Sequence, residues 1–397
     1  MKIFKLGKTY IIILLLNTFQ IALSQNKTLF VFDKTTKLPI ENAIITYVNL
    51  NEGTFTNTEG KSYITSKNSN LKISSLGFED VVLDIEKMAV SDTVFMIPKV
   101  VELDEIVIKS FNLNKALQFV LDNYEKLYVA IPFEKECNFK ETVLIDNQLK
   151  RLILTKVNWW GKTYKLQNNS DLKLRLGTID YNKNIPLNIY VDVPRINENK
   201  SGYIVPNSLI NSIYLNTYLT DFIKYNKNLA STVEQSPADQ IIVSFESEWE
   251  NLKDVSKRSR GKITFDKNTK AILDFATITE FKNNLTKKII KENQKETTNE
   301  TKNTAVKLTF YKAANNVLSL KSFEATIEGS ITYDNKLHSS VFANSIYVLK
   351  ETPVNKVDND GLIDLSKPIY QNLPAKTVTT ANSIILNQSE TDFIENK

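Results

Sequence analysis

Residues 43–65 read AIITYVNLNEGTFTNTEGKSYIT, and this stretch decides the fold of the first part of the chain. Two β-like runs, Ala43–Val48 and Tyr63–Thr65, are separated by the turn sequences Asn51-Glu52-Gly53 and Thr58-Glu59-Gly60. Working outward, the same pattern continues in five further runs: Leu29–Phe32, Leu71–Ser75, Val81–Ile85, Thr93–Ile97 and Glu105–Ile108. Short strands about ten residues apart, divided by turn residues, predict an all-β sandwich of seven strands.

Several residues of this segment match the motif of a known family. They are Asp33, Pro39, Ala43, Gly53, Thr54, Gly60, Ser75, Gly77 and Phe78, followed by a closing strand Leu103-Asp104-Glu105-Ile106-Val107-Ile108. On these residues, segment 25–109 resembles the carboxypeptidase-regulatory-like domain, a transthyretin-like (prealbumin-like) sandwich common in envelope proteins of Bacteroidota. The resemblance implies structural roles for the motif residues. Lys37 departs from it, because it stands where the family has a turn glycine.

The N-terminus has the pattern of a secretory signal. Lys2, Lys5 and Lys8 precede the apolar run 11–16, and Ala22 and Ser24 supply the small residues that precede a cleavage site. We therefore expect residues 1–24 to be a signal peptide and the protein to be exported, either periplasmic or associated with the outer membrane. The alternative is an uncleaved anchor, because residues 9–26 carry no charge. No later segment is apolar enough to form a transmembrane helix.

Residues 110–397 predict a larger antiparallel β-rich domain with one or two helices, so the fold class is mainly β with minor α. Leu113, Leu117, Val120, Tyr124 and Tyr128 share one face of an amphipathic helix over 112–130, which opens this domain. A second helix is expected over 207–223. Most of the remainder alternates as strands, except for the polar segment 287–304, which we expect to be the mobile tip of a long hairpin.

A second, looser resemblance extends over this domain. The segments 139–142 (FKET) and 261–266 (GKITFD) resemble those of longer Bacteroidota proteins that carry the same sandwich. That family has no assigned activity, so the resemblance carries no function to this chain.

Composition excludes several chemistries. The formal charge of +5 includes three lysines of the signal segment, and no basic cluster supports a nucleic-acid partner. His338 and Cys137 are the only residues of their types. A zinc peptidase site of two histidines and a glutamate is therefore impossible, and no metal or other cofactor is expected. No Gly-x-Ser-x-Gly motif suggests a serine hydrolase.

Two groups of residues are candidates for a functional site. Glu246, Glu248 and Glu250 alternate along a predicted strand, about 6.6 Å apart, with Phe245 and Trp249 on the other face. This pattern favours a solvated acidic face, and a pair of catalytic or cation-binding carboxylates is the alternative.

Trp159 and Trp160 form the second group. Tryptophans in a β-rich domain are most often core residues, and an exposed pair that stacks on a sugar or a partner is the alternative.

The best functional hypothesis is a non-enzymatic exported protein that acts in binding or assembly. Its partner would be an envelope protein or an apolar or glycan ligand. One alternative is a carrier in which the strands of 110–397 curve into a half-barrel around an apolar ligand. A second alternative is a hydrolase that uses the carboxylates at 246–250.

We expect the mature protein to begin at Gln25, because the apolar run is short and Ala22 and Ser24 occupy the positions read by signal peptidase. N-terminal sequencing of the exported protein tests this. Retention of residues 1–24 would show an uncleaved anchor instead.

Overall fold

A computed structural model of the chain describes residues 26–48, 50, 53–75, 77–99, 111–168, 171–185, 213–226, 228–234, 236–237, 239–252, 255–289, 296–313, 317–333, 335–365, 367, 369–374, 378–379 and 386–395. The chain divides into two compact units, Met1–Lys99 (unit 1) and Val100–Lys397 (unit 2). The predicted closing strand Glu105–Ile108 and the predicted boundary at residue 109 lie outside the described residues.

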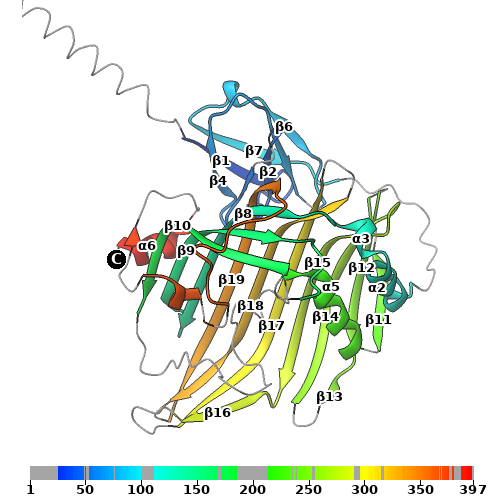
Figure 1. The fold of residues 1–397 in the computed structure, drawn as a ribbon, viewed down its shortest axis with the longest axis vertical. Helices are drawn as coiled ribbons and strands as arrows, with labels where there is room; N and C mark the ends of the chain where they lie inside the picture. The colour runs from blue at the N-terminus through cyan, green and yellow to red at the C-terminus, as the bar shows by residue number, and fades with distance from the viewer. Residues whose placement is uncertain are drawn as a thin grey trace, which may run out of the picture. The chain divides into compact units, whose positions relative to one another are not determined.

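Unit 1 consists of two small sheets around one core. Its elements are β1 (Asn26–Asp33), β2 (Ile44–Tyr47), β3 (Gly53–Phe55), β4 (Lys61–Thr65), β5 (Leu71–Ser74), β6 (Val81–Leu83), the 3-10 helix η1 (Ile85–Lys87) and β7 (Ser91–Met96). One sheet has the order β4-β1-β7 and the other β3-β2-β5-β6. The strands of unit 1 are drawn in blue and cyan in Figure 1. Leu29, Val31, Ile45, Ile64 and Ile73 are fully buried in the core that they share.

Two sequence expectations in unit 1 need correction. Gly53 begins strand β3, although it was expected to end a turn, because residues 53–55 pair with β2. Ile85 belongs to η1, not to the preceding strand. The Asp84 side chain caps η1 by accepting the backbone N–H of Glu86, which ends β6 at Leu83.

The motif residues of unit 1 build turns. The Asp33 carboxylate accepts hydrogen bonds from the Thr35 N–H (2.7 Å) and the Thr36 hydroxyl (2.8 Å), and these bonds lower the pKa of Asp33. Lys37 adopts φ of +61°, the left-handed conformation for which glycine is the usual choice. Gly60 also has a positive φ, and a Cβ there would lie 2.4 Å from the Val31 carbonyl oxygen. Only glycine fits at that position.

Unit 2 is organised by one large antiparallel sheet. Its strands are β8 (Phe133–Ile145), β9 (Gln148–Gly161), β10 (Leu172–Asn184), β11 (Leu229–Glu234), β12 (Gln240–Ser247), β13 (Glu250–Leu252), β14 (Val255–Asp266), β15 (Ile272–Lys282), β16 (Leu285–Ile289), β17 (Glu296–Lys312), β18 (Leu318–Tyr333), β19 (Lys336–Pro353) and β20 (Val378–Thr379). The order is β11-β12-β14-β15-β17-β18-β19-β8-β9-β10-β20, with β13 and β16 attached to β14 and β17. The pairing of β19 with β8 joins the late strands to the early ones.

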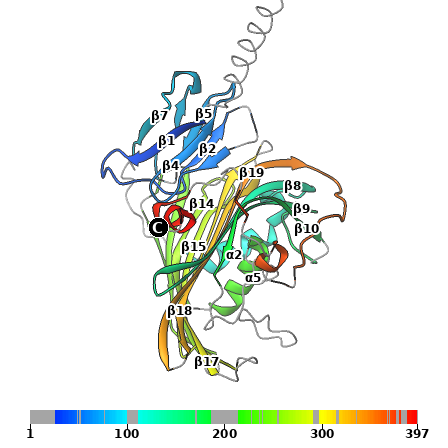
Figure 2. The ribbon, with the colours of Figure 1, turned by 90° about the vertical axis from the view of Figure 1, so that its left-hand side faces the viewer.

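Helices lie on the concave face of this sheet (Figure 2). Helix α2 (Leu113–Asp122) begins at Asn112, whose side chain accepts the Lys115 N–H at 2.9 Å. The helix expected over 112–130 is interrupted at Asn123, which takes a non-helical conformation and bonds through its side chain to the Phe119 carbonyl. The short α3 (Tyr124–Leu127) follows. Helix α5 (Leu215–Tyr225) corresponds to the second predicted helix, and residues 207–212 lie outside the described part of the chain.

Aromatic side chains fill the space between these helices and the sheet. Tyr124 and Tyr128 stack at 4.6 Å, and Tyr128 meets Phe310 of β17 at 5.2 Å. The Tyr128 hydroxyl donates to the Ile272 carbonyl (3.1 Å) and accepts the Ile272 N–H (3.0 Å). It therefore satisfies the hydrogen bonding of both backbone groups at the start of β15. Burial raises the pKa of Tyr128 far above its usual value.

The opposite face of the sheet is covered near its β10 end. Helix α6 (Gln388–Glu395) places Phe393 and Ile394 against Leu152, Leu154 and Tyr181. Successive residues of β9 point to opposite faces, so Leu152 and Leu154 meet α6 while Ile153 lies in the aromatic core.

The polar segment 287–304 lies in a hairpin, as expected, but more of it is strand than the sequence predicted, and residues 290–295 lie outside the described part of the chain. Residues 285–289 and 296–312 are strands β16 and β17, which pair with each other, and β17 also pairs with β18. Hydrophobic periodicity is missing in these strand residues, so it did not reveal them. Threonine is β-branched and is common in strands, and Thr297, Thr298, Thr301 and Thr304 supply that preference here.

A buried polar network fills the place where β18 and β19 separate. Their ladder ends at the Ser322–Tyr347 pair, although both strands continue. In the gap, the fully buried Lys135 ammonium donates to the Ser319 hydroxyl (2.5 Å) and forms an ion pair with Glu351. Side-chain bonds therefore replace the missing backbone ladder.

A second lysine lies beside this network. Lys321 is buried, and its ammonium is 3.5 Å from the Val348 carbonyl oxygen. Burial, together with the nearby Lys135 ammonium, lowers the pKa of Lys321 to about 8. Burial favours the neutral form of Glu351, but the Lys135 ammonium and the hydroxyls of Ser319 and Tyr311 outweigh it and lower the pKa of Glu351.

We expect Lys321→Met to stabilise the protein at pH 7. In the unfolded chain a lysine titrates near 10.4, so between pH 8 and about 10 the unfolded state binds more protons and wild-type stability rises with pH. The variant lacks this proton linkage. Its free energy of unfolding should exceed that of the wild type by roughly 1–3 kcal/mol at pH 7, and the difference should shrink by pH 9.5.

Urea unfolding of both proteins at pH 7 and pH 9.5 measures this difference. Lys350→Met, at an exposed position of β19, is the control and should show no such trend. A variant that is less stable at pH 7, or a difference that is independent of pH, would show that burying the Lys321 ammonium does not destabilise the folded protein.

Candidate functional site

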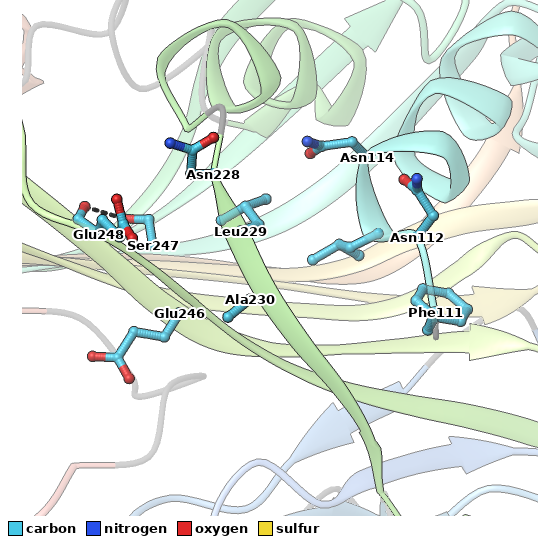
Figure 3. Close-up of a pocket in the computed structure, with 10 residues that line it drawn as sticks. Phe111, Asn112, Asn114, Asn228, Leu229, Ala230, Glu246, Ser247 and Glu248 are labelled. Atoms are coloured by element: carbon cyan, nitrogen blue, oxygen red, sulfur yellow. Dashed lines mark hydrogen bonds between the residues drawn. The ribbon is translucent and has the colours of Figure 1, made fainter. Parts of the chain in front are cut away.

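A pocket opens in unit 2 between the start of α2 and the edge of the large sheet. Its volume is about 650 Å³. It is lined by Phe111, Asn112, Leu113, Asn114, Asn228, Leu229, Ala230, Glu246, Ser247 and Glu248. Figure 3 shows Asn112 and Asn114 on one side and Ser247 and Glu248 on the other. The site therefore combines amides and carboxylates with apolar side chains.

Local interactions hold the two walls of this pocket. The Phe111 ring packs against Phe265 at 5.8 Å, and its carbonyl oxygen accepts the Ser231 hydroxyl of β11 at 2.8 Å. These contacts attach the residue before α2 to the sheet. The capping bond of Asn112 then fixes where the helix begins.

The carboxylate candidates do not form the continuous face that the sequence predicted. Strand β12 ends at Ser247, because the Ser247 hydroxyl accepts the Ser259 N–H (2.9 Å) and donates to the Glu248 carbonyl (3.0 Å). The chain resumes as β13 at Glu250, opposite Lys257 of β14. Glu246 and Glu248 line the pocket, and Glu250 does not.

This interruption also separates the two aromatic residues that were expected to share a face. Phe245 is buried in the aromatic core. Trp249 instead lies against cations, with the Lys282 ammonium 3.9 Å and the Arg258 guanidinium 5.2 Å from its ring. Arg258 also forms a 2.9 Å ion pair with Glu246. The expectation of one shared apolar face is therefore wrong, because strict alternation does not survive the break.

Both tryptophan candidates are buried, with exposed fractions of 3% for Trp159 and 9% for Trp160. The Trp159 N–H donates to the Tyr214 hydroxyl (3.2 Å), and the Trp160 N–H donates to the Val354 carbonyl (2.8 Å). Their indole donors are thus satisfied inside the protein. Neither residue lines the pocket.

The remaining chemically distinctive residues lie elsewhere. Burial raises the pKa of Cys137 to about 12, so its thiol stays protonated at neutral pH. The Nδ1 atom of His338, in β19, lies 2.7 Å from the carboxylate of Asp146, in the turn between β8 and β9. Among the described residues, no cluster of His, Cys, Asp and Glu could hold a metal ion, and no helix is long and apolar enough to span a membrane.

The asparagines of the pocket are the residues that sequence reasoning missed. From the sequence, Asn112 is only the first residue of the helix expected over 112–130. Asn114 and Asn228 sit next to element ends in an asparagine-rich sequence, so nothing local separates them from other asparagines. Only the fold brings them together.

Comparison with known proteins gives little beyond this geometry. No protein family and no curated protein matches the sequence. A structural similarity is found to a "putative membrane-associated protein of unknown function" from Bacteroides fragilis, at 7% identity and a TM-score of 0.15 over 82% of this chain and 98% of that one. Similarity at this level does not establish a shared fold.

Proposed function

We propose that the chain is a non-enzymatic exported protein of the cell envelope that binds an extended segment of a partner polypeptide along strand β11. In this proposal, a basic side chain of the segment enters the pocket between β11, β12 and α2. The observation that carries the proposal is the position of the pocket at the edge of the large sheet, beside a packed concave face.

The edge position supports backbone pairing. Among the described strands, β11 has β12 on one side and no strand on the other. An unpaired strand edge offers N–H and carbonyl groups to an added strand, which is a common mode of peptide recognition. Leu229 and Ala230 belong both to this strand and to the pocket lining.

The lining chemistry supports a basic side chain. Glu246 forms an ion pair with Arg258, whereas Glu248 is exposed and has no cationic partner within the described part of the chain. The three asparagine side chains supply further hydrogen-bonding groups, and the partly buried Leu229 offers an apolar surface for an aliphatic stem. A lysine or arginine side chain matches this combination.

The alternatives have less support. An apolar carrier needs an open groove, but the described concave face is packed with aliphatic side chains from α2 and with aromatic side chains from α3, α5 and the sheet. A hydrolase needs carboxylates that converge on one bond. Glu246 is engaged with Arg258, and its side chain points away from the asparagines in Figure 3.

A phage-displayed library of linear heptapeptides, selected against residues 25–397, tests the proposal. We expect selected peptides to be enriched in lysine or arginine. Glu248→Lys should weaken the best peptide by at least about tenfold, because it replaces an attractive charge contact with a repulsive one. N-methylation of alternate peptide nitrogens should also abolish binding if the peptide pairs as a strand.

Glu328→Lys is the matched control, since Glu328 is an exposed carboxylate of β18 far along the sheet order from β11. It should leave peptide binding unchanged. Selection without basic enrichment, or equal losses for the two variants, would contradict the proposed site.

A further inference from the structure

The outward face of the β4-β1-β7 sheet in unit 1 is unusually aromatic. Alternation places Leu29 and Val31 of β1 in the core, so Phe30 and Phe32 point outward. The register sets Phe32 beside Phe95 of β7. Tyr63 of β4 pairs with Thr28 and so lies on the same face.

The rings on this face are close together and accessible. Phe30 and Phe32 are 6.5 Å apart with an interplanar angle of 16°, and Phe32 and Phe95 are 6.0 Å apart. Tyr63 is 43% exposed, Phe95 45% and the neighbouring Ile97 40%. A contiguous apolar surface of this kind is typical of an interaction site.

Two lysine ammonium groups lie against the rings. The Lys37 ammonium lies 4.6 Å from the centre of the Phe95 ring, and the Lys61 ammonium lies 5.1 Å from that of Tyr63. Among the outward strand positions whose side chains the structure describes, the others are serine, threonine or apolar residues. The one carboxylate near Lys37 in this turn is Asp33, which accepts hydrogen bonds from Thr35 and Thr36. The face is therefore complementary to an apolar surface that carries negative charge.

The ammonium groups also argue against a sugar as the occupant. A sugar ring binds by lying flat on an aromatic face. At Phe95 and Tyr63 an ammonium already lies over that face. Ring edges and lysine head groups remain available, and this combination suits the boundary between lipid head groups and acyl chains.

We propose that this face of unit 1 binds the surface of a lipid bilayer that contains anionic lipids. The aromatic rings enter the head-group region, and Lys37 and Lys61 contact lipid phosphates. Leu38, which is 64% exposed next to Lys37, adds a further apolar contact. This proposal is independent of peptide binding at β11, because it involves a different unit and a different ligand.

Vesicle co-sedimentation of residues 25–397 tests the inference. We expect binding to vesicles of phosphatidylethanolamine and phosphatidylglycerol, and much weaker binding when phosphatidylcholine replaces the anionic lipid. Added salt should weaken the binding, because it screens the lysine–phosphate attraction. Tyr63→Ser combined with Phe95→Ser should lower the partition coefficient by at least about tenfold, since it removes two large apolar side chains from the interface.

Val48→Ser combined with Val82→Ser is the matched control. Both valines are more than half exposed and belong to the β2 and β6 side of unit 1. These substitutions should leave vesicle binding unchanged. If the aromatic double variant does not fold, Lys37→Glu combined with Lys61→Glu replaces it and should abolish the preference for anionic lipid.

Three outcomes would overturn the inference. They are no binding by the wild type, equal binding to neutral and anionic vesicles, and unchanged binding by both the aromatic and the lysine variants. If the wild type does not bind vesicles and the aromatic variant has a lower melting temperature, the aromatic face packs against other protein residues.

Discussion

The Tyr128 hydroxyl makes two hydrogen bonds to the backbone of Ile272, and the architecture of unit 2 depends on this contact. Tyr128 follows α3 directly, so the contact ties the helical layer to the start of β15. The same ring stacks on Tyr124 and meets Phe310, which places it at the centre of the aromatic core. A buried hydroxyl is costly without hydrogen-bond partners, and here the carbonyl and the N–H of Ile272 supply both.

A packed concave face has consequences for where the molecule can bind. A curved sheet with an open interior would suit an apolar cargo, but the described interior is occupied by aromatic side chains. The binding sites that we propose therefore lie at an edge and on an outer face. The pocket beside β11 and the aromatic face of unit 1 are such places, and each has a different chemistry: carboxylates and amides at the first, rings and lysines at the second.

Sequence patterns predicted the fold class and the helix before β8, because apolar periodicity reports burial directly. They failed at three kinds of place. The threonine-rich start of β17 has no apolar alternation, although its strand preference is strong. The break after Ser247 depends on one side-chain bond to Ser259, which periodicity cannot reveal. The pocket joins Asn114 to Asn228 only through the fold. Glu246 and Glu248 were found among the candidates because their spacing was unusual, but their geometry was not foreseen.

Urea unfolding of Tyr128→Phe compared with Tyr124→Phe tests the central claim most directly. Both rings are buried in the same stack, but the Tyr124 hydroxyl has no hydrogen-bond partner within the described part of the chain. We expect Tyr128→Phe to lower the free energy of unfolding by about 1–3 kcal/mol, because it leaves two backbone groups unpaired, and Tyr124→Phe to cost little. Equal effects of the two substitutions, or no loss for Tyr128→Phe, would contradict it.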